Sequence, residues 1–354
     1  MHKLAIHEQQ NSFSDRWISY CNINNIPFKL VNCYDSSIIY DLKNVDGLLW
    51  HWAHSETKGQ LVAKQIIAAA ENLGITVFPN INTCWHYDDK IAQKYLLEAI
   101  GAPVVPSHIF LSKTEALLFI EKANYPLVFK LRCGAGSQNV KLVKTKKEAI
   151  SLCNKAFYKG FVAAEGYFTD GKTKFRKVKD LMNLFEKMKR LPISIKNTMM
   201  DRRLFALQKG YIYFQDFLPD NLFDTRITII GDRAFGFQRN VRPGDFRASG
   251  SGHIYYDKDK IDMRCVEISF KVAKQLKTQS LCFDYIFDNN NEPRICEISY
   301  CFQSNAVHNC TGYWDSHLSW VNKKMWPEDA ILIDLIEKLA GNEHYNSPQS
   351  LENP

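Results

Sequence analysis

The sequence predicts a mixed α/β (α+β) fold built from more than one subdomain, and three observations support this fold class. The chain has 354 residues, which exceeds the size that a single hydrophobic core usually holds. Its apolar content of 45%, with 13% aromatic residues, is typical of well-packed globular proteins. Strand-like apolar runs alternate with helix-like segments over residues 1–80, which indicates a small domain with a parallel sheet.

The first elements belong to this N-terminal α/β domain, which we expect to span residues 1–85. The expected strands are short, apolar and buried, and they cover residues 28–31, 47–50 and 75–78. Residues 59–73 carry apolar side chains at helical spacing and predict a helix between the last two strands. A second amphipathic helix is expected over residues 87–100, because Gly101 is a suitable C-terminal cap and Pro103 prevents its continuation.

Residues 86–215 predict a second α/β subdomain that contains a lysine followed by a glycine-rich loop. Helices are expected at 113–123 and 146–157, and between them an apolar strand ends in Lys130. The loop Gly134–Ser137 then leads into another apolar strand. A lysine fixed on a strand and glycine N–H groups without a nearby Cβ suit the phosphates of a nucleotide triphosphate. The alternative is a plain hairpin turn, which is the more common use of Gly-X-Gly between strands.

A basic stretch at 166–203 is expected to form a helical insertion in this subdomain. Residues 172–190 contain eight Lys or Arg residues together with apolar residues, a pattern typical of an amphipathic helix. The basic side chains form either a solvated helix face or a docking surface for an anionic substrate.

Residues 216–341 predict a third, C-terminal subdomain, followed by a flexible polar tail at 342–354. A helix is expected over 261–277, where apolar residues recur at helical spacing. The β signal is strong in this part of the chain, with expected strands at 211–217, 224–230, 233–239, 281–287 and 294–299.

The last two of these strands form an expected hairpin that carries two carboxylates. Asp284 and Glu297 each lie in the middle of an apolar strand, where a carboxylate is costly to bury unless it is paired or bound to a metal. If both face the same side, they are the expected ligands of a Mg²⁺ ion that bridges nucleotide phosphates. The alternative is simple alternation, with both acids on the solvent face of the hairpin.

Arginines are the third candidate group. Arg247 lies beside a loop of small residues, 249–252, which can either wrap around an anion or serve as a plain surface loop. Arg226, Arg239 and Arg242 add guanidinium groups that can bind a carboxylate or phosphoryl group through two hydrogen bonds.

Charge and cysteine content limit the compartment and the partners. The net charge of +7 is scattered along the chain, which argues against a nucleic-acid partner. The ten cysteines form no CxxC pair, so most are expected to be buried free thiols in a reducing compartment. No run of 18 apolar residues occurs, so no integral membrane contact is expected and a cytoplasmic location is favoured.

In their order along the chain, these motifs resemble the ATP-grasp superfamily, and especially its glutathione synthetase-like carboxylate–amine ligases. The resemblance covers residues 80–300 and is carried by Asp89-Lys90, Val128-Phe-Lys130, Gly134-Ala-Gly-Ser137, Phe214-Gln-Asp-Phe-Leu218, Asp224-Thr-Arg226, Asp245-Phe-Arg247, Asp284 and Glu297-Ile-Ser299. It implies an ATP-grasp fold, in which two α+β subdomains that follow the N-terminal domain clamp ATP between them.

The resemblance also implies roles for individual residues. Lys90, Lys130 and the loop residues Gly134, Gly136 and Ser137 would bind the ATP phosphates. The adenine edge and the ribose would be met by Gln215, Asp216, Phe217, Leu218 and Asp220, with Asn221 as an alternative at the ribose.

The same resemblance assigns the metal site and the arginines. Asp284 and Glu297 would hold two Mg²⁺ ions, for which Mn²⁺ is a substitute, and Glu297 would bridge them. Ser299 stands where the family usually has asparagine, so the second ion would have a shorter ligand and the site could be weakened. Arg247 and Arg226 would stabilise the transferred phosphoryl group and the acyl intermediate.

The implied activity is ATP-dependent ligation of a small-molecule carboxylate to an amine through an acyl phosphate, with release of ADP. The chain is also similar to ATP-grasp proteins of bacterial surface-polysaccharide biosynthesis, with which it shares the stretches 50–52, 134–140, 247–252 and 297–300. That similarity implies an amino sugar, a nucleotide-sugar or another glycan precursor as the acceptor. The alternatives are a peptide ligase, a small-molecule phosphotransferase and an ATP-binding scaffold with a weakened metal site. A homodimer is expected from the habit of the family.

Overall fold

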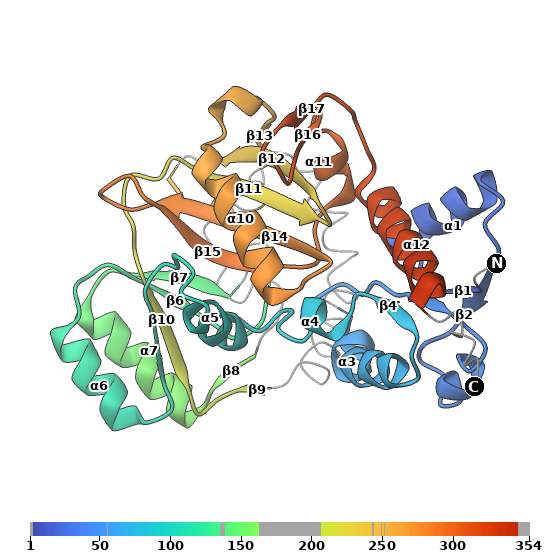
Figure 1. Ribbon diagram of the computed structural model, residues 1–354. Helices are drawn as coiled ribbons and strands as arrows, with labels where there is room; N and C mark the ends of the chain where they lie inside the picture. Colours follow the sequence, from blue (N-terminus) through green and yellow to red (C-terminus); the bar gives the residue numbers. More distant parts are fainter. Residues whose placement is uncertain are drawn as a thin grey trace, which may run out of the picture.

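The structure is a computed structural model that describes residues 3–54, 56–134, 139–162, 207–242, 244–248, 250 and 252–345 (Figure 1). The expected basic helix at 172–190 lies outside these residues, as do Gly136 and Ser137 of the glycine-rich loop.

The first sheet is parallel, with the strand order β2-β1-β3-β4. Its strands are β1 (Leu4–His7), β2 (Phe28–Val31), β3 (Gly47–Leu49) and β4 (Thr76–Phe78), and its helices are α1 (Phe13–Ile23), α2 (Ile38–Asp41) and α3 (Thr57–Asn72). The expected parallel sheet is confirmed, and the helix expected at 59–73 is α3. The central strand β1 was not expected, because Leu4–Ile6 is too short a run to give a signal. The expectation that residues 28–31 are buried is wrong, because β2 lies at the sheet edge with Lys29 and Leu30 exposed.

The second sheet is antiparallel, with the order β5-β10-β6-β7. Its strands are β5 (Ser107–Phe110), β6 (Leu127–Lys130), β7 (Val140–Val143) and β10 (Ile212–Asp216). The helices α6 (Lys113–Lys122) and α7 (Lys146–Tyr158) lie together on one face of the sheet (Figure 1). Their apolar residues, such as Ala116 and Leu152, form a core with Phe129 and Phe214 of the central strands. A short pair, β8 (Phe161–Val162) and β9 (Leu207–Gln208), lies beside this unit.

The third sheet is also antiparallel, and its strands run in the order β15-β14-β11-β12-β16-β17, with β13 on β12. Its strands are β11 (Phe223–Ile230), β12 (Arg233–Asn240), β13 (Ile254–Tyr255), β14 (Ser280–Phe287), β15 (Pro293–Ser299), β16 (Tyr313–Asp315) and β17 (Trp320–Val321). Helix α10 (Met263–Leu276) covers one face, and the 3₁₀ turn Lys258–Lys260 precedes it. The ring centroids of Trp314 and Trp320 lie 4.8 Å apart, and both side chains pack against this core. These contacts attach β16 and β17 to the rest of the sheet.

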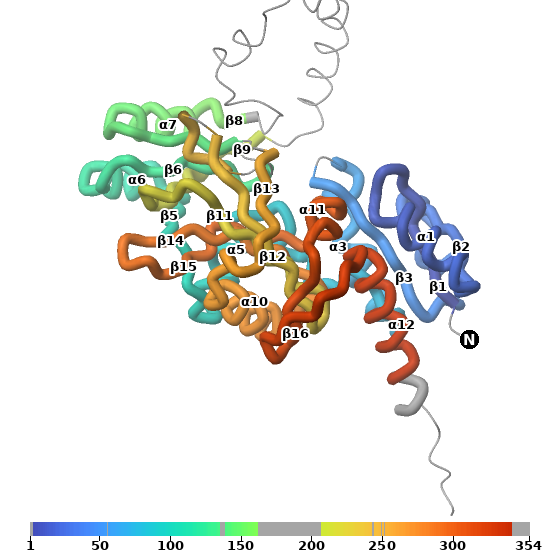
Figure 2. Tube along the Cα trace, turned by 90° about the horizontal axis from the view of Figure 1, so that it is seen from above, coloured from blue at the N-terminus to red at the C-terminus, as the bar shows by residue number. Residues whose placement is uncertain are grey.

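Three further helices connect these units. They are α4 (Ile81–Cys84), α5 (Lys90–Ala99) and α11 (Ser304–His308). The last helix, α12 (Pro327–Tyr345), returns to the first sheet and lies beside α1 (Figures 1 and 2). Arg16 of α1 makes two hydrogen bonds to the Asp329 carboxylate, at 2.7 and 2.6 Å. The expected C-terminal subdomain 216–341 therefore shares its last helix with the N-terminal core.

Two expectations from composition can be compared with the structure. The ten cysteines are free thiols, and most of them are buried. Among the described residues, no helix is both long and apolar enough to cross a membrane.

Candidate active site

A cavity of about 350 Å³ lies between the second and third sheets. It collects most of the predicted site residues, namely Lys130, Gly134, Gln215, Asp216, Phe217, Leu218, Asp220, Arg247, Asp284 and Glu297. Lys90 lines an adjoining hollow that shares Lys130 and Glu297 with the cavity. Arg226 and Ser299 are not among the residues that line either space.

Lys130 ends β6 in the middle of the second sheet, where it pairs with Tyr213 of β10 and Val140 of β7. Its residue is only 5% exposed. The Lys130 Nζ atom lies 3.6 Å from the Cys296 thiol, and no carboxylate of the described residues is within ion-pair distance. Because a buried ammonium without a counter-ion is unfavourable, this position is suited to an anion that enters the cavity.

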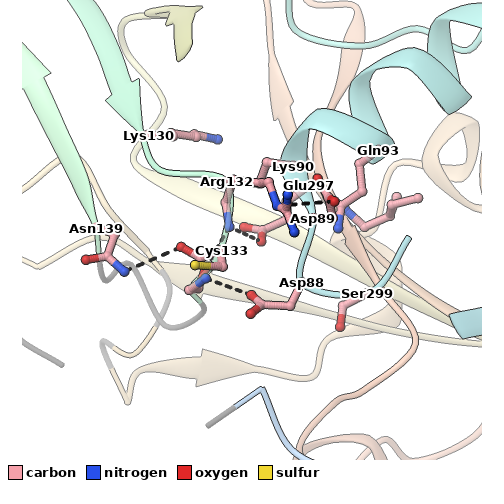
Figure 3. A network of polar contacts seen from close by, with 12 residues as sticks. Asp88, Asp89, Lys90, Gln93, Lys130, Arg132, Cys133, Asn139, Glu297 and Ser299 are labelled. Atoms are coloured by element: carbon pink, nitrogen blue, oxygen red, sulfur yellow. Dashed lines mark hydrogen bonds and ion pairs between the residues drawn. The ribbon is translucent and has the colours of Figure 1, made fainter. Parts of the chain in front are cut away.

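Lys90 is the first residue of α5, which begins there because the Asp89 side chain accepts hydrogen bonds from the N–H groups of Ile91 and Ala92. Lys90 Nζ contacts Glu297 Oε1 at 3.1 Å and donates to the Gly134 carbonyl at 2.7 Å (Figure 3). Burial alone would lower the pKa of Lys90, but the charges of Glu297 and Asp88 outweigh it, so the pKa is raised. Lys90 therefore stays charged and already has partners.

The two carboxylates lie opposite each other on β14 and β15, as expected for the hairpin. Asp284 receives two hydrogen bonds from Arg226, at 2.7 and 2.8 Å, and an ion pair from Arg239 at 2.9 Å. Burial would raise the pKa of Asp284, but the two arginines hold it well below its usual range. These contacts use most of the acceptor positions of a carboxylate. Among the described residues, Glu297 has only Lys90 as an ion-pair partner, so it has more capacity for a cation.

Ser299 is engaged in a local turn. Its Oγ donates to the Cys301 carbonyl at 2.8 Å and accepts from the Cys301 N–H at 3.2 Å. In the part of the chain that the structure describes, no three His, Cys, Asp or Glu side chains converge in a metal-binding group. Carboxylate oxygens suit a Mg²⁺ ion that a nucleotide would bring with it, and the ligand roles of Asp284, Glu297 and Ser299 stay predictions.

Residues 215–218 form the end of β10 and the start of the connection to β11, and they line the cavity. Gln215 is buried, and its Nε2 donates to Ser107 Oγ at 3.2 Å. The Asp216 N–H donates to the Pro106 carbonyl at 2.9 Å, which fixes the backbone of this segment. The Phe217 ring packs edge-on against Phe246, with 6.0 Å between the ring centroids. This contact joins residues 215–218 to the segment that contains Arg247.

Two residues follow as candidates for the ribose. The Asn221 amide is occupied by the backbone of Phe287, since its Nδ2 donates at 2.9 Å and its Oδ1 accepts at 2.8 Å. Asp220 lines the cavity, in a left-handed backbone conformation with φ of 62°.

The predicted arginines have different environments. Arg247 lines the cavity, and Asp245 fixes it through hydrogen bonds of 2.9 Å from Nε and 2.8 Å from Nη2. Arg226 is half-buried, makes two hydrogen bonds to Asp284, and is not among the residues that line the cavity. Arg239 spans Asp224 and Asp284, with Nε donating to Asp224 Oδ1 at 2.7 Å. Sequence reasoning suggested Arg239 as a substrate ligand, whereas the structure gives it these two carboxylate partners.

One neighbouring residue was missed. Asp88 precedes the Asp89-Lys90 pair, and its Oδ1 accepts a hydrogen bond from the Gly134 N–H at 2.7 Å (Figure 3). The only sequence signal is a second aspartate before the lysine, because the contact depends on a loop 46 residues away.

Residues 89–173 match the family model of the ATP binding domain of the carbamoyl-phosphate synthase L chain. No curated protein sequence matches the chain significantly.

Several solved structures are similar in fold. D-alanine–D-alanine ligase from Bacillus anthracis has 14% identity and a TM-score of 0.57, with 98% of this chain and 100% of that chain covered. N5-carboxyaminoimidazole synthase from Aspergillus clavatus, solved with ADP and 5-aminoimidazole ribonucleotide, has 10% identity and a TM-score of 0.56 over 95% of this chain and 77% of that chain. A RimK domain ATP-grasp protein from Sphaerobacter thermophilus has 11% identity and a TM-score of 0.55 over 95% and 99%. At these identities the likeness shows a shared fold.

Proposed function

This chain has the ATP-grasp fold, and we propose that it is an ATP-dependent carboxylate–amine ligase that forms an amide and releases ADP and phosphate. The observation that carries the proposal is the charge arrangement across the cavity. Lys130 is buried on one wall, with no carboxylate partner among the described residues, and Asp284 and Glu297 lie on the other wall. A nucleotide triphosphate with Mg²⁺ would complement both walls.

In the proposed reaction, Lys130 and Lys90 bind phosphate oxygens, and residues 215–218 meet the adenine edge. Glu297, together with Asp284, would hold Mg²⁺, which supplies charge neutralisation during phosphoryl transfer. A carboxylate oxygen of the first substrate attacks the γ-phosphorus, and the bond to the ADP oxygen breaks. Arg247, which lines the cavity, would stabilise the transferred phosphoryl group.

The second step forms the amide. The amine nitrogen attacks the acyl carbon, the C–O bond to phosphate breaks, and the nitrogen loses a proton. Water must be excluded from the acyl phosphate during this step.

The substrates are proposed at a coarser level. The similar structures include a D-alanine–D-alanine ligase, a D-cycloserine synthetase and a ligase solved with its precursor peptide, so the fold itself accommodates different acids and amines. The polysaccharide similarity favours an amino sugar or glycan precursor as the amine, and a peptide ligase is the alternative. A cytoplasmic homodimer is part of the proposal.

A scaffold role is the second candidate, and one observation favours it. Arginines occupy Asp284, and the Ser299 hydroxyl is committed to a turn, so the metal site depends mainly on Glu297. A phosphotransferase would retain the metal site but would need no amine.

Thermal unfolding with and without MgATP tests the proposal, with Glu297→Ala as the test variant and Glu267→Gln as the control. Glu267 is exposed on α10, away from the cavity. Ligand at about 100 times its dissociation constant should stabilise the native state by about 2.7 kcal/mol. We expect a shift of a few degrees in the wild type and the control, and none in Glu297→Ala. ADP release that requires both an acid and an amine would identify a ligase, and the absence of any shift would contradict the nucleotide site.

A further inference from the structure

Asp88 is bonded to the glycine-rich loop in a way that the proposed reaction does not use. Its Oδ1 accepts the Gly134 N–H at 2.7 Å, and Lys90 Nζ donates to the Gly134 carbonyl at the same distance (Figure 3). Both backbone polar groups of Gly134 are thus held by side chains that are two residues apart. The orientation of Gly134 and the position of the Lys90 ammonium are therefore linked.

The same segment holds the loop at a second point. The Lys90 N–H donates to the Arg132 carbonyl at 2.9 Å, and Asp89 forms an ion pair with Arg132 at 3.4 Å. From the other strand, Asn139 Nδ2 donates to the Cys133 carbonyl at 3.4 Å. Residues 132–134 are thereby fixed relative to α5 as well as to their own hairpin.

The backbone of Asp88 is specialised for this contact. Its φ of 54° lies in the left-handed region, which is uncommon for residues other than glycine and is best tolerated by Asn and Asp. The sequence pattern predicted that this helix begins at Tyr87, but α5 begins at Lys90. The left-handed conformation of Asp88 explains the later start, because it interrupts the helical backbone. Strained residues of this kind are concentrated at functional sites.

We propose that Asp88 is a positioning residue that holds Gly134 so that the Gly134 carbonyl keeps the Lys90 ammonium at the edge of the nucleotide cavity, against Glu297. This proposal rests on the proposed nucleotide site. Asp88 acts through the Gly134 peptide and does not touch the nucleotide. It is the acceptor oxygen that matters, so an asparagine at this position would serve, whereas glycine would leave the Gly134 N–H without its partner.

Three variants separate this role from backbone effects. Asp88→Gly accepts the left-handed conformation without strain but lacks the acceptor. Asp88→Asn keeps both the acceptor and the tolerance of positive φ. Asn25→Gly is the matched control, because Asn25 has the same φ of 54° in an exposed turn after α1.

Two measurements on the full chain complete the test. The first is the hydrogen-exchange rate of the Gly134 amide without nucleotide, which we expect to rise about tenfold or more in Asp88→Gly and to stay near wild type in the other two variants. The second is the dissociation constant of MgATP by calorimetry, which we expect to weaken about tenfold in Asp88→Gly only, with rescue in Asp88→Asn.

The outcomes are distinguishable. Faster exchange in Asp88→Gly with unchanged MgATP affinity would overturn the positioning role while leaving the nucleotide site intact. Equal loss of affinity in Asp88→Asn would also overturn it, since charge and not the acceptor would then matter. If the wild type bound no MgATP, the proposed function itself would fail, and Asp88 would have no nucleotide to position Lys90 for.

Discussion

The two walls of the cavity balance their charges differently. On the third sheet, Asp284 and Asp224 are neutralised by Arg226 and Arg239 from neighbouring strands of the same sheet. On the opposite side, within the part of the chain that the structure describes, Lys130 has no carboxylate partner, and Lys90 forms an ion pair with Glu297 of β15. The Asp–Arg pairs within the third sheet thus stabilise the fold, whereas we expect the lysines on the opposite wall to bind an anionic ligand. Substitutions on the two walls should therefore change stability and binding in different proportions.

The largest expected effect comes from breaking the network within the third sheet. Arg239→Met leaves Asp224 buried without its partner, and the loss of one member of a buried pair costs about 3–5 kcal/mol. Denaturant unfolding measures this loss. Arg264→Gln, which removes exposed ion pairs, is the control and should have a much smaller effect. Equal effects of the two substitutions would show that the buried network carries no special stability.

The two lysines should give opposite changes in stability. Lys130→Met removes a buried ammonium that has no carboxylate partner among the described residues and should raise the free energy of unfolding by about 1 kcal/mol. Lys90→Met leaves the Gly134 carbonyl and Glu297 without their donor and should lower it by about 1–3 kcal/mol. Both should weaken MgATP binding by about tenfold or more. Chemical denaturation would measure the changes in stability, and calorimetry on the same samples would measure MgATP binding. Destabilisation by Lys130→Met would contradict the unfavourable burial of that lysine.

The pH dependence of stability sharpens the same comparison. The folded pKa of Lys90 is raised above its unfolded value, so its contribution is complete below about pH 10.4 and is lost as the pH rises through the folded pKa. Between about pH 8 and 12, the free energy of unfolding should therefore decrease more steeply with pH in the wild type than in Lys90→Met. Parallel curves would mean that Glu297 and Asp88 do not stabilise the charged amine.

The sequence predicted the parts of the site that have a local signal. Lys130 ends an apolar strand, and Asp284 and Glu297 interrupt two others, so periodicity located all three. Pairing between elements was not predictable, because the contact of Arg239 with Asp224 and Asp284 depends on the register of β11 between β12 and β14. The contact of Asp88 with Gly134 depends on how α5 meets the hairpin. The central strand β1 was missed because Leu4–Ile6 is too short to show a period.

The smallest expected effect concerns Ser299, the position that departs from the usual family pattern. Its hydroxyl bonds only to the Cys301 backbone in the described structure, so Ser299→Ala should cost about 1 kcal/mol in stability and change MgATP affinity less than about threefold. Glu297→Gln, measured by the same calorimetry, should lose most of the Mg²⁺-dependent binding, because Glu297 has the greater free acceptor capacity. If Ser299→Ala instead lost as much Mg²⁺-dependent binding as Glu297→Gln, the hydroxyl would have to leave its turn to bind the ion. The ligand would then rearrange the wall formed by the third sheet. That wall would no longer differ from the opposite wall in having its charges paired before the ligand binds.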